Sequence, residues 1–292
     1  MEEFLQQIIN GLSLGSIYAL VALGYTMVYG IIKLINFAHG DVYMIGAYTA
    51  FIVTTYFGFN FFTALIACMV VCGILGVLIE RVAYRPLRKA PRITALITAI
   101  GVSYVIEYTT QLIMGTSVRS FPALVPTTSW QIGPVKITYL QVLIFSITIV
   151  LMLVLTFIVQ KTKIGRAMRA VSADENAARL MGISVDNTIS VTFLSGSALA
   201  GAAGLLVGVY YNSVSPLMGM VPGLKAFVAA VFGGIGSIPG ALVGGLFIGI
   251  AETMVVAYGS SLYRDAIVYG ILILVLIIKP AGLFGSTERE KV

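Results

Sequence analysis

The chain has 292 residues, of which 59% are hydrophobic and only 10% are charged, and its formal net charge is +6. Soluble globular domains carry about 25% charged residues and are about 45–50% apolar, so the composition excludes an ordinary soluble domain. A chain of this length can hold about eight or nine membrane spans of about 20 residues each.

Apolar runs between charged residues predict the membrane helices. The run between Val42 and Ile79 is too long for one span, and the segment 57–60 is its natural turn. Glycines break the run after residue 223 into pieces near 224–235 and 240–258. These pieces either cross the membrane as two short spans or form a re-entrant hairpin. The other helices are expected near 5–30, 42–57, 61–79, 93–115, 139–160, 188–211 and 262–279.

These elements predict an all-α polytopic membrane protein. We expect a single transmembrane domain over 1–292, with eight to nine transmembrane or re-entrant helical segments. The chain begins with the acidic Met1-Glu2-Glu3, where a signal peptide has a basic region, so no cleaved signal is expected.

Lysine and arginine residues predict the orientation, because short loops rich in them face the cytoplasm. The segment 116–138 has few basic residues and is expected to be a periplasmic loop, with the N-terminus periplasmic and the C-terminus cytoplasmic. Topology and anionic lipid account for the basic balance without any nucleic acid. With alternating spans, 14 of the 18 basic residues face the cytoplasm: Lys33, Arg81, Arg85, Arg88, Lys89, Arg92, Lys161, Lys163, Arg166, Arg169, Arg179, Lys279, Arg289 and Lys291.

Small residues predict tight helix packing. Cys68 and Cys72 lie one helical turn apart and are expected to be core residues rather than a redox pair, because two cysteines on one helix rarely bridge. No metal site is expected. Glycines at four-residue spacing let helix backbones approach closely in lipid. They occur at Gly11/Gly15, Gly204/Gly208, Gly236/Gly240/Gly244 and Gly245/Gly249.

Two stretches interrupt apolar runs with small or polar residues, at 35–41 and at 233–240. Paired broken helices in the two halves of a transporter commonly frame the substrate path. We therefore expect two broken-helix repeat halves, although ordinary turns at the membrane surface are the alternative. The candidate path residues in these stretches are Asn36, His39, Asp41, Gly233, Gly234, Gly236 and Ser237.

Ionisable residues within the apolar runs are further candidates for the path, because buried charge is costly in a membrane. They are Glu107, Lys225 and Glu252. Glu107 is expected either to be a hydrogen-bonded structural acid or to pair with Lys225. The pair Arg264-Asp265 is expected at the outer interface. A proton-coupled carrier would show several acids or histidines in series, and here they are scattered.

The cytoplasmic loop 161–187 predicts a short docking helix. Ser172 and Glu175 have capping-box spacing, and Gly182 is placed to end the helix in the left-handed conformation. The alternative is a surface helix lying on the membrane. The candidate docking residues are Ser172, Asp174, Glu175, Asn176, Ala177, Ala178, Leu180, Met181 and Gly182.

The loop resembles the coupling motif of ABC importer permeases, Glu-Ala-Ala-x-x-x-Gly, with Ala177, Ala178 and Gly182 in place and the acid one position early at Glu175. Over nearly the whole chain the sequence is similar to H-type branched-chain amino-acid permeases. The motifs that carry this likeness are Gly15-Ser-Ile-Tyr-Ala-Leu, Asn36-Phe-Ala-His-Gly-Asp, Glu80-Arg-Val-Ala-Tyr-Arg-Pro-Leu, Gly165-Arg-Ala-Met-Arg-Ala, Gly223-Leu-Lys-Ala-Phe, Gly233-Gly-Ile-Gly-Ser-Ile-Pro-Gly and Pro280-Ala-Gly-Leu.

The resemblance implies a permease subunit of an ATP-driven importer of leucine, isoleucine and valine in the bacterial inner membrane, working by alternating access. Its implied partners are a homologous M-type permease, two cytosolic ATP-binding subunits and a periplasmic amino-acid-binding protein. The sequence contains no Gly-x-x-x-x-Gly-Lys-Ser/Thr loop, so ATP and magnesium are expected on the partner subunits and no cofactor on this chain. Alternatives are a urea or short-chain amide ABC permease, and a stand-alone channel or secondary carrier.

Overall fold

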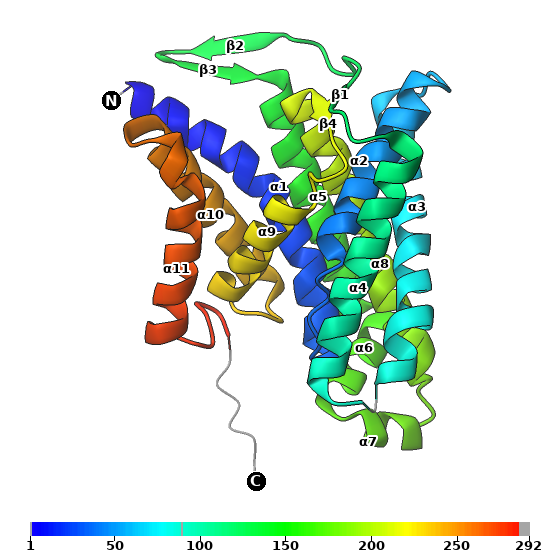
Figure 1. The fold of residues 1–292 in the computed structure, drawn as a ribbon. Coiled ribbons are helices and arrows are strands. Elements are labelled where there is room, and N and C mark those ends of the chain that lie inside the picture. Colours follow the sequence, from blue (N-terminus) through cyan, green and yellow to red (C-terminus); the bar gives the residue numbers. More distant parts are fainter. Residues whose placement is uncertain (1, 89, 286–292) are drawn as a thin grey trace.

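The computed structural model describes residues 2–88 and 90–285, which form a bundle of long helices (Figure 1). The antiparallel hairpin of β2 (Ser129–Ile132) and β3 (Val135–Thr138) lies at one end of the bundle, called here the hairpin end. The short helix α7 (Glu175–Leu180) lies at the opposite end, the α7 end. Within the described residues, seven helices are long and apolar enough to cross a membrane, which confirms the all-α polytopic class.

The first part of the chain contributes four helices. They are α1 (Glu2–Ile32), α2 (His39–Thr55), α3 (Phe61–Ile79) and α4 (Arg92–Met114). A π-helical turn at 80–84 and a 3-10 turn at 85–87 continue α3.

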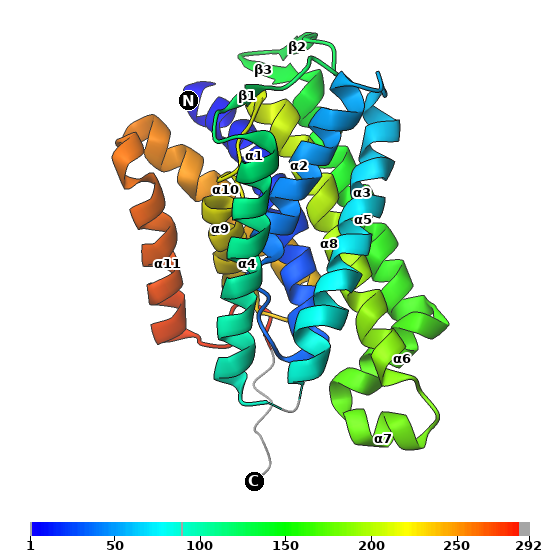
Figure 2. The same ribbon diagram turned by 45° about the vertical axis from the view of Figure 1, so that its right-hand side comes forward.

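The middle part of the chain runs from the hairpin end to the α7 end and contributes elements at both. After α4, the strand β1 (Arg119–Ser120) and the hairpin lead to α5 (Tyr139–Lys161), which starts with a capping box between Thr138 and Gln141. Thr162 then caps a helix that was not expected, α6 (Lys163–Ala173). Figure 2 shows α6 and α7 beyond the end of α5.

The last part of the chain returns through the bundle. It comprises α8 (Val185–Tyr211), β4 (Ser213–Val214), α9 (Met220–Gly233), α10 (Ile238–Tyr258), a 3-10 turn at 261–263 and α11 (Arg264–Ile278). The strand β4 pairs antiparallel with β1 at the hairpin end. The two pieces expected near 224–235 and 240–258 are thus a short helix and a full-length one.

The helices α1–α4 and α8–α11 form two repeats that run in opposite directions. The long helix of each repeat ends at a residue with positive φ, Lys33 at 55° and Asn212 at 54°. A non-helical segment follows each, at 33–38 and at 212–219, before a shorter second helix begins. Across the repeats, α1 packs against α10 and α8 packs against α3. The two halves are therefore inverted copies of one arrangement.

This arrangement corrects the expected pairing of the two breaks. The segment 33–38 corresponds to 212–219, whereas 234–237 is a tight turn between α9 and α10. The first turn of α2 meets the end of the second break in the interior, since a Cβ added to Gly40 would lie 2.5 Å from the carbonyl oxygen of Gly219. Irregular backbone is tolerated in a membrane protein where other parts of the protein cover it in this way.

The helices α1 and α8 pack against each other and supply much of the core. Cys68 and Cys72 are buried free thiols, and their Sγ atoms lie 3.3 Å from the carbonyl oxygens of Gly46 and Val42. They join α3 to α2, so the expectation that they are core residues is confirmed.

Candidate functional site

The predicted docking helix exists but begins later than expected. Ser172 lies inside α6, where its hydroxyl donates to the carbonyl of Arg169. The cap of α7 is Asp174, whose carboxylate accepts from the backbone N–H groups of Asn176 at 2.8 Å and Ala177 at 3.0 Å. The expected capping box from Ser172 is therefore wrong, because α6 extends through that residue. Gly182 ends the loop at φ 79°, as expected.

The exposed apolar surface of this helix is narrower than expected. Leu180 and Met181 are 89% and 81% exposed, and these two side chains define what we call the α7 tip. Ala178, in contrast, is only 4% exposed and belongs to the core, so it is unavailable for docking. Glu175 forms an ion pair with Arg179 at 2.7 Å along the helix surface.

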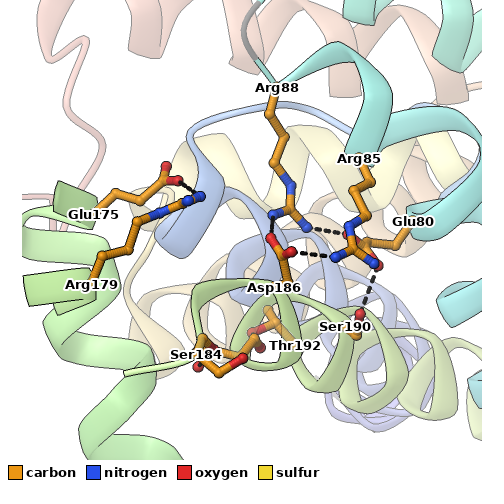
Figure 3. A network of polar contacts seen from close by, with 10 residues as sticks. Glu80, Arg85, Arg88, Glu175, Arg179, Ser184, Asp186, Ser190 and Thr192 are labelled. Atoms are coloured by element: carbon orange, nitrogen blue, oxygen red, sulfur yellow. Dashed lines mark hydrogen bonds and ion pairs between the residues drawn. The ribbon is translucent and has the colours of Figure 1, made fainter. Parts of the chain in front are cut away.

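A network of ion pairs lies between the end of α3 and the start of α8, close to the α7 loop (Figure 3). Arg88 bridges two carboxylates, pairing with Glu80 and, at 2.5 Å, with Asp186. Arg85 also pairs with Asp186. The Ser190 hydroxyl donates to Glu80 at 2.7 Å, and the Glu80 side chain is fully buried.

The network joins the two repeats at the α7 end. Glu80 and Arg88 follow α3, whereas Asp186 and Ser190 belong to the first turns of α8. Only the segment 181–184 separates α7 from α8, so a displacement of the α7 tip acts directly on the helix that carries Asp186. The arrangement can transmit movement from an exposed surface to the packed pair of α3 and α8.

The residues of the first break are buried. Asn36 accepts from the Tyr84 hydroxyl at 3.0 Å, and the His39 ring lies 4.8 Å from that of Tyr25. Neither nitrogen of His39 has a hydrogen-bond partner among the described residues. Asp41 accepts from the Ser103 hydroxyl of α4. These side chains hold α2 in place, and whether they line a path stays a prediction.

The residues expected at the second break form the turn between α9 and α10. Gly234 and Gly236 both have a φ of 100°, and the Ser237 hydroxyl caps α10 by accepting from the N–H of Gly240 at 3.2 Å. The carbonyl groups of Phe232 and Gly233 accept from the N–H groups of Leu283 and Phe284, so the end of the described chain packs beneath this turn.

A second ionic cluster lies deep near the hairpin end. Lys225 Nζ lies 3.1 Å from Glu252 and 2.6 Å from Asp265. Arg264 also pairs with Glu252, and the Tyr18 hydroxyl donates to Glu252 at 2.9 Å. The expected alternative pairing of Lys225 with Glu107 is wrong. Glu107 is buried in α4 and forms no ion pair among the described residues.

The cluster borders a cavity of about 460 Å³ that opens near the hairpin end. Its lining includes the charged residues Lys225, Arg264 and Asp265 and the tyrosines Tyr18, Tyr43 and Tyr211. Arg264 and Asp265 begin α11 near the hairpin end with side chains that are 37% and 52% exposed, and they also pair with the buried Glu252 and Lys225. Their expected position at the outer interface stays a prediction. A cavity that combines apolar walls with a few convergent polar groups is typical of a small-molecule site.

Sequence reasoning missed several members of both networks. Arg264 and Asp265 stand at the start of a span, where charges are common and carry little signal. Tyr18 and Tyr211 have no distinctive sequence context. Glu80 offered a signal, because it directly follows an uncharged run of 38 residues from Val42 to Ile79, yet its partner Ser190 is 110 residues away.

The chain was compared with known proteins. The family described as "branched-chain amino acid transport system / permease component" matches residues 7–276. The high-affinity branched-chain amino acid transport system permease protein BraD of Pseudomonas aeruginosa is 44% identical over 99% of this chain and 98% of its own length. The corresponding LivH protein of Escherichia coli is 45% identical over the same shares. The LivM permease of Salmonella typhimurium is 26% identical over 94% of this chain and 69% of its own length.

The match to the family covers almost the whole membrane bundle, from the first turns of α1 to the last turn of α11. It also includes the α7 loop, both ionic networks and the two breaks of the inverted repeat. The chain therefore belongs to the permease components of branched-chain amino acid transport systems.

Proposed function

We propose that this chain is the H-type permease subunit of an ATP-driven importer that moves leucine, isoleucine and valine from periplasm to cytoplasm by alternating access. The observation that carries the coupling role is the α7 tip, two exposed apolar side chains on a short capped helix directly before α8. The 44% and 45% sequence identity to BraD and LivH, which extends over 99% of this chain, supports the substrate class.

The α7 end is proposed to face the cytoplasm and the hairpin end the periplasm of a bacterial inner membrane. Arg81, Arg85, Arg88 and the basic residues of α6 support this orientation, because they gather toward the α7 end. Lys89, Arg289 and Lys291, which were expected on the same side, lie outside the described residues. The N-terminus is then periplasmic and the C-terminus cytoplasmic.

The proposed partners are an M-type permease, two cytosolic ATP-binding subunits and a periplasmic binding protein. The similarity to LivM supports a pair of related permeases. Hydrolysis of ATP is assigned to the separate subunits, with this chain binding no cofactor of its own. Selection among amino acids is then largely the task of the binding protein.

Uptake by the reconstituted complex tests this function. Proteoliposomes containing this chain, its partner permease and the ATP-binding subunits, supplied with binding protein and internal ATP, are expected to accumulate labelled leucine but not labelled urea. Uptake of urea alone would identify a urea or amide permease. Uptake of leucine by this chain alone, without ATP, would identify a secondary carrier.

The docking role makes a separate prediction. Leu180→Asp and Met181→Asp place a carboxylate in an apolar contact, so we expect the ATP-binding subunits to dissociate during affinity purification and ATP-driven uptake to fall to background. The two side chains are exposed, so the thermal unfolding temperature of the permease should not change.

Ile132→Asp is the matched control, since Ile132 is also an exposed apolar residue, 65% exposed, in the hairpin at the opposite end. This variant is expected to retain the ATP-binding subunits. Full retention of these subunits by both tip variants would show that the α7 tip is not the docking surface. Ala178→Asp is unsuitable as a docking test, because it would bury a charge in the core.

A further inference from the structure

The cavity near the hairpin end contains a balanced set of charges. Lys225 and Arg264 are cationic, and Glu252 and Asp265 are anionic, so the cluster as a whole is neutral. A neutral cluster does not favour a free cation or a free anion by its net charge. It can favour a ligand that itself carries one charge of each sign, if groups of each sign remain available to it.

Arg264 and Asp265 retain groups that a ligand could bind, whereas Glu252 and Lys225 are occupied by partners within the cluster. Glu252 is buried and accepts from Tyr18, Lys225 and Arg264, and Lys225 is buried between two carboxylates. In Arg264, Nε binds Glu252 and Nη2 donates to the Tyr211 hydroxyl at 3.3 Å, while Nη1 has no partner among the described residues. One oxygen of Asp265 faces Lys225, and the side chain is 52% exposed.

These free groups come from consecutive residues and have opposite charges. The guanidinium group of Arg264 matches a carboxylate, because its planar donors form parallel hydrogen bonds to two oxygens. The second oxygen of Asp265 can accept from an ammonium group. Both side chains line the cavity. The two ionic groups of an α-amino acid, which are also joined through one carbon atom, fit such a pair.

The rest of the lining suits an apolar side chain. Leu14, Val207, Leu217 and Met218 form apolar walls beside the charged end of the cavity. The buried Tyr43 also lines it, and its hydroxyl has no hydrogen-bond partner among the described residues. A buried hydroxyl without a partner is uncommon in proteins, and a polar ligand or water in the cavity would satisfy it.

We propose that this cavity is a binding site for a zwitterionic amino acid on the permease itself, with Arg264 holding the carboxylate and Asp265 the ammonium group. The proposal rests on the proposed function, since it places a substrate site on the side from which the importer takes up its cargo. The permease then recognises the main-chain groups common to all its substrates, independently of the binding protein.

Binding to the complex in the absence of binding protein tests this site. Nucleotide-free transporter in lipid nanodiscs is incubated with labelled leucine, which is displaced by unlabelled leucine, leucinamide or 4-methylpentanoate. Leucinamide lacks the carboxylate and 4-methylpentanoate lacks the ammonium group. We expect leucine to displace the label at least about tenfold more effectively than either analogue, which corresponds to about 1.4 kcal/mol.

Two variants assign the contacts. Asp265→Asn is expected to reduce the preference for leucine over 4-methylpentanoate, and Arg264→Gln to reduce its preference over leucinamide. If either residue had a purely structural role, its substitution would weaken the binding of all three ligands equally and leave the preferences among them unchanged. Glu3→Gln and Lys136→Gln are the matched controls, because both residues are exposed charges near the hairpin end and neither lines the cavity.

Leu217→Trp keeps the test decisive if the charged variants fail to fold. Leu217 is largely exposed and lines the cavity, so tryptophan should fill the cavity without loss of thermal stability and should abolish leucine binding. Unchanged binding by this variant, or equal displacement by all three ligands in wild type, would overturn the site. Failure of wild-type proteoliposomes to take up leucine would instead overturn the proposed function.

Discussion

Arg88→Ala is expected to lower the free energy of unfolding of the permease by about 3 kcal/mol, because breaking a buried ion pair costs about 3–5 kcal/mol and Arg88 is slightly exposed. The substitution leaves the buried carboxylate of Glu80 with only the Ser190 hydroxyl. It also frees the start of α8 from the end of α3, so ATP-driven uptake should fall while ATP hydrolysis continues. Denaturant unfolding in detergent and the ratio of transport to hydrolysis measure the two effects.

Three further variants separate the buried pair from the exposed one. Arg85→Ala removes a pair with Asp186 in which both side chains are well exposed, and should cost less than about 1 kcal/mol. Arg88→Lys keeps the charge but cannot bridge two carboxylates as a guanidinium does. Its loss in free energy of unfolding should therefore lie between those of Arg85→Ala and Arg88→Ala. Adding Glu80→Gln to Arg88→Ala should recover stability, because no charge is then left unpaired. Equal losses for Arg85→Ala and Arg88→Ala would contradict the assignment.

Gly249→Ala is expected to destabilise the permease by up to about 3 kcal/mol, the upper part of the range for overpacking. The Cβ would lie 2.6 Å from the carbonyl oxygen of Gly11 and closer still to the backbone of Gly15. Backbone atoms of α1 cannot rotate away as a side chain would, so α1 and α10 must separate. This contact joins the two repeats, and transport should fall with stability.

Gly270→Ala is the matched control in α11, where a Cβ would meet no heavy atom within 4 Å. Alanine is favoured over glycine within helices by about 0.5–1 kcal/mol, so this substitution should be neutral or stabilising. We therefore expect Gly249→Ala to lower the thermal unfolding temperature and Gly270→Ala to leave it unchanged or raise it. If Gly249→Ala lowered the thermal unfolding temperature by no more than Gly270→Ala changes it, the α1–α10 contact would be able to expand at little cost in stability.

Local signals in the sequence predicted most of the helices. Uninterrupted apolar runs located the spans, and the four-residue spacing of Gly11 and Gly15 with that of Gly245 and Gly249 correctly predicted tight contacts, which the structure places between α1 and α10. The left-handed conformation of Gly182 also follows from local rules. These features depend on neighbours close in the chain, and such neighbours are visible in one sequence.

Features that depend on distant neighbours were missed or misassigned. The pairing of Lys225 with Asp265 and Glu252, rather than with Glu107, is set by how α9, α10 and α11 pack. Ser172 lost its expected capping role because α6 packs against α5 and α8 and so extends through residue 173. The small or polar residues at 35–41 and 233–240 predicted that these two breaks correspond, whereas the inverted repeat pairs 33–38 with 212–219, which share little sequence.

The inverted repeat has an energetic consequence for the empty transporter. Because the halves are antiparallel copies, exchanging their two shapes would reverse which end of the bundle is open while preserving the kinds of contact within it. We therefore expect the open-outward and open-inward states to be close in free energy before any ligand binds. A shift from 1:99 to 99:1 between two states requires only about 5.5 kcal/mol of differential binding. If the proposed ATP-binding subunits supply binding energy of this size at the α7 end, it would suffice to switch the permease from one state to the other.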